Sequence, residues 1–200
     1  MAVALRKPRA AAVDKRESII AAALELFNER SFNGTPMPLV AERAGVGAGT
    51  IYRYFASKEA LGNAVFRDCK LALQRHLLER TRSGLTPRQE FGAMWYGLWE
   101  FFKENPAAFR FLETHSHRSY LDRASAATSD AVSVSLTDFV RRGQAAGAIR
   151  RAAPAVLIAM AFGAFIGLVK EADAGRFSLT RALVGSAEEL VWAMLRAQPE

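Results

Sequence analysis

Cysteine is almost absent from this chain of 200 residues, which contains Cys69 and no other. A single cysteine cannot form an internal disulfide, so the chain fits a reducing cytoplasm better than a disulfide-rich secreted scaffold. No histidine or acidic residue is spaced to activate Cys69, and we therefore expect a packed thiol rather than a nucleophile. The N-terminus carries basic residues but no apolar run behind them, which argues against a secretory signal.

Sequence signatures of catalysis and of metal binding are also missing. We find no glycine-rich phosphate loop after a strand and no paired acid, base or nucleophile, so we predict no catalytic residue and no enzyme. Among the 3 histidines, His115 and His117 should point to different sides of a helix. Glu113 could share a metal with His117, but a third ligand is lacking, so we predict no metal and no cofactor. Period-two alternation long enough for a strand is absent, which favours an all-α fold.

Positive charge and apolar residues are plentiful. The chain has 27 Lys and Arg against 20 Asp and Glu, a net charge of +7, and this excess is compatible with a polyanionic partner. Hydrophobic residues make up 50% of the chain, enough for one or two compact domains with a sizeable core. Periodicity and capping signals predict about nine helices, near residues 14–30, 35–44, 48–55, 57–82, 86–104, 105–117, 121–146, 154–175 and 179–195.

The most informative stretch is residues 35–58, TPMPLVAERAGVGAGTIYRYFASK. It predicts two short helices joined by a tight turn, an arrangement that places the second helix in the major groove of DNA. Thr35 can cap the first helix, and Gly45 can end it because glycine adopts the left-handed conformation cheaply. Three side chains of the second helix can donate hydrogen bonds to phosphates or base edges: Thr50, Tyr52 and Arg53.

The run AGVGAGTIYRYFASKEAL, with LELF upstream, resembles the DNA-binding domain of the TetR/AcrR family of bacterial transcriptional regulators. The specific part of this resemblance covers residues 19–65. It implies an N-terminal helix-turn-helix DNA-binding domain of three helices at residues 14–56 and a C-terminal helical ligand-binding and dimerisation domain at 57–200. Residues 1–13 would be a flexible basic arm, which either lies in the minor groove or is a solvated tail.

The predicted recognition helix departs from the family pattern at its start. Many members carry a serine and then a lysine or another polar residue where this chain has Gly47 and Ala48, so base reading falls more heavily on the three donors named above. The residues expected to face DNA bases or backbone are Thr35, Gly47, Ala48, Gly49, Thr50, Tyr52, Arg53, Tyr54 and Lys58. For Tyr54, core packing beside Phe55 is an equal alternative.

Aromatic residues are concentrated in the middle of the chain, since 9 of the 20 (13 Phe, 4 Tyr and 3 Trp) lie in residues 91–120. A cavity lined by aromatic side chains with a few polar groups is typical of a small-molecule site, and the resemblance implies an inducer pocket among the middle helices. The candidate pocket residues are Phe91, Trp95, Trp99, Phe102, Phe109, Leu112, His115 and Tyr120. Core packing at helical spacing explains the same pattern equally well.

Small residues recur every four positions on the apolar helix that should begin at Pro154, and the last helix carries an apolar stripe. Two such helices could pair with their mates from a second copy as a four-helix bundle, which the resemblance also implies. The candidate interface residues are Ala159, Gly163, Gly167, Leu183, Leu190 and Met194. Alternatively, both faces only close the core of a single chain.

The same apolar helix meets the lower length limit for a membrane span, because residues 152–169 carry no charge. Alanine and glycine dominate it and Pro154 lies near its start, so we expect a buried helix in a soluble protein.

The sequence thus predicts a homodimeric repressor that binds a palindromic operator in double-stranded DNA and is released by a small, largely apolar or aromatic ligand. A helical small-molecule sensor with weak or non-specific DNA binding is the alternative, and a single-span membrane protein is a third possibility.

Overall fold

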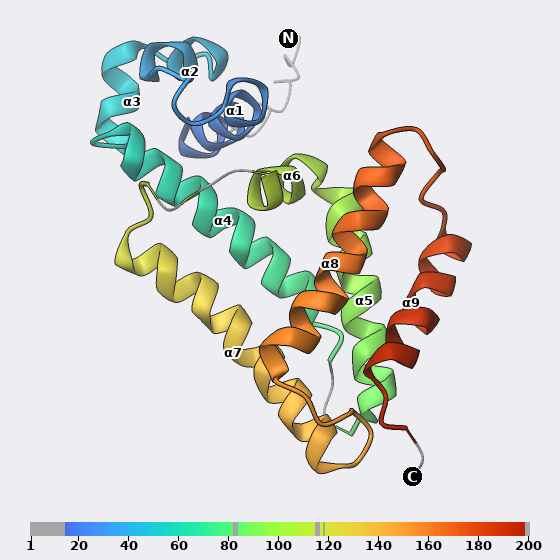
Figure 1. Ribbon diagram of the computed structural model, residues 1–200. Helices are drawn as coiled ribbons and strands as arrows, with labels where there is room; N and C mark the ends of the chain where they lie inside the picture. Colours follow the sequence, from blue (N-terminus) through green and yellow to red (C-terminus); the bar gives the residue numbers. More distant parts are fainter. Residues whose placement is uncertain (1–14, 82–83, 115–116, 118, 199–200) are drawn as a thin grey trace, which may run out of the picture. The chain divides into compact units, whose positions relative to one another are not determined.

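In the computed structural model, which describes residues 15–81, 84–114, 117 and 119–198, the described part of the chain forms nine α-helices (Figure 1). They are α1 (Lys15–Arg30), α2 (Met37–Arg43), α3 (Ala48–Tyr54), α4 (Lys58–Leu78), α5 (Pro87–Glu104), α6 (Pro106–Thr114), α7 (Arg123–Ala145), α8 (Pro154–Asp173) and α9 (Arg181–Leu195). The all-α prediction is confirmed. The arm predicted at residues 1–13 lies outside the described residues.

The chain divides into two compact units between Val65 and Phe66, inside α4. In the first unit, α1 packs on α2 and α2 packs on α3. Its core consists of fully buried apolar side chains from all four helices: Ile19, Leu26, Phe27, Val40, Ile51, Leu61 and Val65. Because the last two belong to α4, this unit extends past the boundary that we placed before Ser57.

In the second unit, α5 packs against α6, α7 and α9, and α8 packs against α7 and α9. The ring of Phe165 on α8 is fully buried among aromatic rings of α5 and α6. Its centroid lies 5.4 Å from that of Trp95 and 5.9 Å from that of Phe109, both in edge-on geometry. Such edge-to-face contacts add to the free energy of burial. Much of the central aromatic cluster is therefore core.

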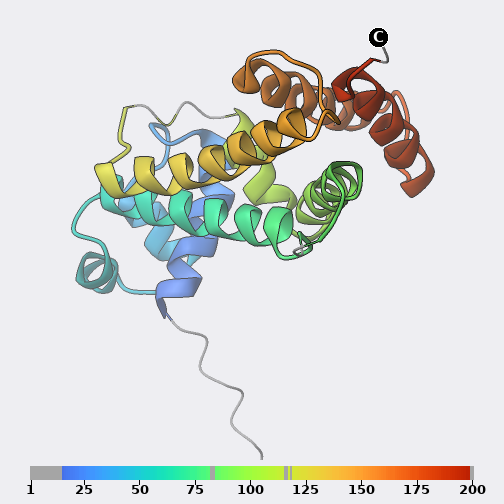
Figure 2. The same cartoon turned by 90° about the horizontal axis from the view of Figure 1, so that it is seen from below.

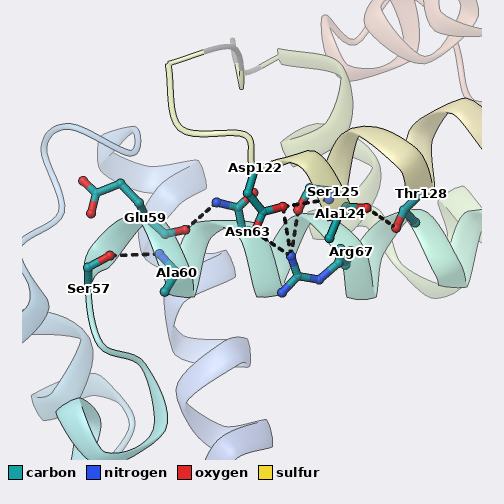
Figure 3. Close-up of polar contacts among 9 residues, drawn as sticks. All are labelled: Ser57, Glu59, Ala60, Asn63, Arg67, Asp122, Ala124, Ser125 and Thr128. Atoms are coloured by element: carbon teal, nitrogen blue, oxygen red, sulfur yellow. Dashed lines mark hydrogen bonds and ion pairs between the residues drawn. The ribbon is translucent and has the colours of Figure 1, made fainter.

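The second half of α4 lies beside α7 in both views of the ribbon (Figures 1 and 2). A polar clamp fixes this pairing at the start of α7 (Figure 3). One nitrogen of the Arg67 guanidinium donates to a carboxylate oxygen of Asp122 at 3.2 Å and to the hydroxyl of Ser125 at 2.9 Å. Asp122 is also the N-cap of α7 and accepts from the Ser125 N–H at 2.7 Å. That N–H, the Ser125 hydroxyl and the Arg67 charge together lower the pKa of Asp122.

Several predicted helix ends are confirmed because local signals set them. Thr86 and Gln89 form a reciprocal capping box at the start of α5, with Pro87 in the first turn. Gly45 and Gly147 follow α2 and α7 in the left-handed conformation, with φ of 66° and 69°.

Other predicted helix ends were wrong, because side chains just outside these helices form hydrogen bonds with the terminal backbone N–H or carbonyl groups. α4 ends at Leu78 rather than near residue 82, since the Thr81 hydroxyl donates to the Leu78 carbonyl at 2.7 Å. α6 ends at Thr114 rather than near residue 117, where a ring nitrogen of His117 lies 3.0 Å from the Phe111 carbonyl oxygen. α7 begins at Arg123, after its Asp122 cap, rather than at residue 121.

Helix α8 is not the buried helix that we expected. Of its 20 residues only Leu157, Phe165 and Val169 are buried. The side that faces away from α7 and α9 is solvent-exposed and apolar, with Val156 53% and Met160 50% exposed. By length and composition alone α8 would also suit a membrane span, but core helices of soluble proteins meet the same criterion, so this is weak evidence.

Candidate nucleic-acid interface and internal cavity

Helices α2 and α3 form a helix-turn-helix. The C-cap of α2 is Ala44, and the Gly45 N–H donates to the Glu42 carbonyl at 3.1 Å. The next N–H, from Val46, returns to the Ala41 carbonyl at 2.9 Å, which makes the turn compact. Gly47 is the N-cap of α3 in an extended conformation. The backbone therefore changes direction over four residues, as the sequence predicted.

The face of α3 that points away from the core carries the predicted DNA-facing residues. Ile51 is fully buried and anchors α3 in the core of the first unit. Phe55, which directly follows α3, is only 5% exposed. At 3.6 residues per turn, Gly49 and Arg53 lie opposite Ile51, and Tyr52 projects to one side of it. These three residues are exposed, and so is Ala48 in the first turn. Tyr52 is 53% exposed, which is unusual for a large aromatic side chain without a partner surface.

Thr50 and Tyr54 lie on the flanks of this face. Thr50 is half-buried, whereas Tyr54 is 43% exposed. The alternative interpretation of Tyr54 as a core residue is therefore wrong, because Phe55 alone turns inward. Gly47 at the N-cap is exposed as well.

Lys58 stands at the start of α4, where Ser57 caps the helix by accepting from the Ala60 N–H at 3.1 Å (Figure 3). Its ammonium nitrogen lies 4.7 Å from the centroid of the Phe32 ring and 3.5 Å from the Asn33 carbonyl oxygen. These contacts hold the half-buried side chain beside the α1–α2 connection.

Thr35 is the exception among the predicted DNA-facing residues. Its side chain is fully buried, and its hydroxyl donates toward the carbonyl oxygens of Leu26 and Ser31, at 3.2 and 2.8 Å. The N-cap of α2 is Pro36, without a side-chain capping bond. Both the predicted cap and the predicted DNA contact of Thr35 were wrong, because its hydroxyl instead ties the end of α1 to the start of α2.

An ion-pair cluster fixes α1 against α2 on the surface of the same unit. The Arg43 guanidinium contacts Glu29 at 3.0 Å and Glu25 at 3.3 Å. Hydrogen bonding to Arg43 lowers the pKa of the Glu29 carboxyl, and the two carboxylates raise the pKa of Arg43. These groups are exposed, so the cluster orients the helices more than it stabilises them.

The second unit contains an apolar cavity of about 80 Å³. It lies where the end of α4, α5, α7, α8 and the end of α9 meet. Its lining residues are Leu77, Phe91, Met94, Trp95, Leu98, Leu136, Phe139, Val140, Leu157, Ile158, Ala161, Phe162 and Leu195. None of them is charged.

The cavity contains two of the eight predicted pocket residues, Phe91 and Trp95. Trp99, Phe109, Leu112 and Tyr120 are buried elsewhere, and Phe102 packs against Phe109 with ring centroids 5.3 Å apart. These five residues do not line this cavity, and two of them, Phe102 and Phe109, pack against the ring of Phe165 with centroids 6.5 and 5.9 Å from it. His115 lies outside the described residues.

Sequence reasoning missed most of the lining, and about half of the lining residues come from α7 and α8. A signal was present on α7, where Val132, Leu136, Phe139 and Val140 repeat at helical spacing. That stripe indicates a buried face but does not indicate that the face borders a cavity.

His117 is buried and both its ring nitrogens have partners. Nδ1 lies 2.6 Å from the Tyr120 hydroxyl, and Nε2 contacts the Phe111 carbonyl as described above. Within the described residues, no group of three or more His, Cys, Asp or Glu side chains could hold a metal ion. Cys69 is buried, and burial raises the pKa of its thiol to about 12, as for a packed thiol.

The six candidate dimer-interface residues lie on α8 and α9. Leu190 is 73% exposed, and Ala159 and Gly163 are also exposed. Added Cβ atoms at Gly163 and Gly167 would meet open space. Gly167, Leu183 and Met194 are half-buried. The core of the chain therefore leaves this surface largely uncovered.

Comparisons with known proteins agree with this architecture. The family model described as bacterial regulatory proteins, tetR family, matches residues 19–65, and the model described as tetracyclin repressor-like, C-terminal domain, matches residues 66–197. The chain belongs to the TetR family. Together, the two matches cover the helix-turn-helix unit and nearly all of the helical unit that follows it.

Individual relatives in the TetR family are distant. An HTH-type transcriptional regulator of Haemophilus influenzae is 24% identical over 192 residues, covering 94% of this chain and 99% of that protein. YhgD of Bacillus subtilis is 26% identical over 104 residues, a stretch that spans 52% of this chain and only 54% of YhgD. The crystal structure of a TetR-family transcription regulator from Marinobacter aquaeolei superposes with a TM-score of 0.83 at 24% identity, covering 92% and 96% of the two chains.

Membership of the TetR family makes this chain a DNA-binding transcriptional regulator rather than an enzyme. The two compact units differ in chemistry. The helix-turn-helix exposes polar side chains, whereas the helical unit encloses an apolar cavity.

Proposed function

We propose that this TetR-family chain acts in the cytoplasm as a homodimeric repressor that binds a palindromic operator through α3. A small, largely apolar ligand held in the second unit releases it from DNA. The observation that carries the DNA-binding part is the exposed surface of α3, where Tyr52 and Arg53 project away from the core that holds Ile51. Lys58 adds a positive charge at the start of α4 that suits a phosphate.

Base reading rests on few side chains in this proposal. Gly47, Ala48 and Gly49 offer no side-chain donor or acceptor, so they let the backbone approach the groove closely instead of reading it. Thr50, Tyr52, Arg53 and Tyr54 supply the polar atoms. Because one short helix contacts few base pairs, two copies with half-sites roughly 34–36 Å apart double the number of bases read.

Replacing Tyr52 with alanine should weaken operator binding about tenfold, or about 1.4 kcal/mol, without unfolding the protein. The fold should persist because half of the Tyr52 side chain is already in solvent. The measurement is fluorescence anisotropy with the intergenic DNA upstream of the chain's own gene, in the presence of unrelated competitor duplex.

Leu71→Ala is a matched control, since Leu71 is 48% exposed on α4 and is not among the proposed DNA contacts. It should bind the operator as the wild type does. Equal affinity of Tyr52→Ala and the wild type would remove Tyr52 from the interface. If unrelated duplex abolishes binding equally in every variant, the protein is not a sequence-specific regulator.

The dimer part of the proposal rests on the uncovered face of α8 and α9. Val156, Met160 and Leu190 are at least half exposed there, and the two glycines of α8 leave room for close approach of a second backbone. In an isologous dimer, this face of one copy would pack against the same face of the other, so both apolar patches would be buried.

Leu190→Glu should convert the dimer to monomers, because the symmetry places two new carboxylates in one apolar interface. Sedimentation velocity at micromolar concentration measures this directly. Val134→Glu serves as the control, since Val134 is 58% exposed on α7 and lies outside the proposed interface. If Leu190→Glu sediments like Val134→Glu, α9 does not form the interface.

Release by a ligand requires that the ligand bind the DNA-incompetent state more tightly than the operator-bound state. The apolar cavity supports this part of the proposal because it lies against Leu77 in the last turn of α4, and the first turns of the same helix belong to the helix-turn-helix unit.

A further inference from the structure

The lining of the cavity restricts the chemistry of its ligand. All 13 lining residues are apolar. The one polar side-chain group among them is the indole N–H of Trp95, and this donates to the Val184 carbonyl at 3.0 Å. A charged or hydrogen-bonding ligand group would therefore lose its water without finding a partner, at a cost of several kcal/mol for a polar group and more for a charge.

The size of the cavity restricts the ligand further. Its volume of about 80 Å³ exceeds what one water molecule needs, but a water there would lack the polar partners that hold buried waters. Drug-sized ligands occupy pockets of roughly 300–1,000 Å³, so they are too large for this space. Dry cavities of about 150 Å³ lined by aliphatic and aromatic side chains bind benzene. This cavity is smaller, so a single ring or a short alkyl chain is the largest molecule that it suits.

Entry is possible between α7 and α8. The floor consists of buried side chains, among them Phe91, Trp95 and Leu157. The half-buried members of the lining are Leu136, Ile158, Ala161 and Phe162. All four come from α7 and α8, so the mouth lies between these helices.

We propose that this cavity binds a small, uncharged molecule without hydrogen-bonding groups, such as a single aromatic ring or a short alkyl chain. Phe162, Ile158 and Leu136 form the mouth, and Trp95 and Leu157 contact the ligand inside. The site and its ligand class follow from the lining. The consequence of binding for DNA affinity rests on the proposed function.

Toluene and benzoate are suitable probes because they share a ring of the same size and differ by a charge. Calorimetric titration of the full-length protein without DNA should give one toluene site per chain. Benzoate should bind at least about tenfold more weakly, since its carboxylate finds no partner. Equal affinity for the two probes, or no heat with toluene, would overturn the inference.

Ala161→Leu tests the location, because the added side chain enters the cavity from α8. It should weaken toluene binding at least about tenfold. Ala131→Leu makes the same change at an exposed position of α7 and should leave the affinity unchanged. If Ala161→Leu fails to fold, Ala161→Val adds less volume at the same place and should also weaken binding. Undiminished toluene affinity in a folded Ala161 variant would place the site elsewhere and refute the assignment.

The same samples separate this inference from the proposed function. Operator binding is measured by anisotropy with and without saturating toluene. If the protein binds toluene but recognises no operator, the ligand site is supported and the repressor proposal is contradicted. If the protein binds its operator but not toluene, the DNA-binding role is supported and the ligand site is contradicted.

Discussion

Replacing Arg88 with methionine is expected to destabilise the second unit by about 3 kcal/mol, because it leaves a buried carboxylate without its partner. Glu188 on α9 is 4% exposed. Both of its carboxylate oxygens accept from the Arg88 guanidinium, one of them at 2.7 Å. The guanidinium carbon also lies 5.5 Å from the centroid of the Trp192 ring. Methionine keeps the apolar stem over the indole but supplies no donor.

Urea unfolding of the four members of a double-mutant cycle measures this effect. Adding Glu188→Gln to Arg88→Met should restore part of the lost stability, since a neutral amide costs less to bury unpaired than a carboxylate. Arg110→Met is the matched control, because Arg110 pairs with Asp173 at 3.1 Å while both side chains are nearly half exposed. It should cost at most about 1 kcal/mol. Equal losses for the two arginine variants would show that Glu188 is not effectively buried.

Gly97→Ala is expected to lower the free energy of unfolding by about 1–3 kcal/mol, although alanine normally stabilises a helix interior relative to glycine. A Cβ atom at Gly97 would clash with the backbone carbonyl of His76 and lie 3.4 Å from the Cα atom of Leu77. The end of α4 thus touches α5 backbone to backbone. A clash with backbone cannot be relieved by a side-chain rotation.

Gly49→Ala provides the comparison, since Gly49 is also helical and an added Cβ there would meet nothing within 4 Å. Its stability should stay the same or rise by up to about 1 kcal/mol. Thermal unfolding followed by circular dichroism compares both variants with the wild type. Stabilisation by Gly97→Ala would mean that α4 and α5 are farther apart than described.

The helix-turn-helix could be predicted from sequence because its determinants are local. Gly45 ends α2 through its own backbone conformation, and the spacing of Ile51 and Phe55 fixes which side of α3 is buried. The capping box at Thr86 likewise set the start of α5. Each of these signals involves residues a few positions apart, so no knowledge of tertiary partners is required.

The predictions that failed concern residues whose partners lie outside their own helix. Threonine is a common N-cap residue, but the Thr35 hydroxyl donates inside the core to carbonyl oxygens near the end of α1. Phe102 and Phe109 were predicted as pocket residues, but the ring of Phe165 from α8 occupies the space beside them. Periodicity shows that a helical face is apolar and leaves open what covers it.

The sequence by itself determined the helical class, the order of the helices, the turn before α3 and the TetR family, since all of these depend on local propensity and on a contiguous motif. Only the tertiary structure decided that α8 lies at the surface and that Leu77, Leu136 and Leu157 bound the cavity together with Phe91 and Trp95. A cavity forms where side chains from several helices fail to meet. That outcome depends on how helices far apart in the sequence pack together, which no single stretch of sequence specifies.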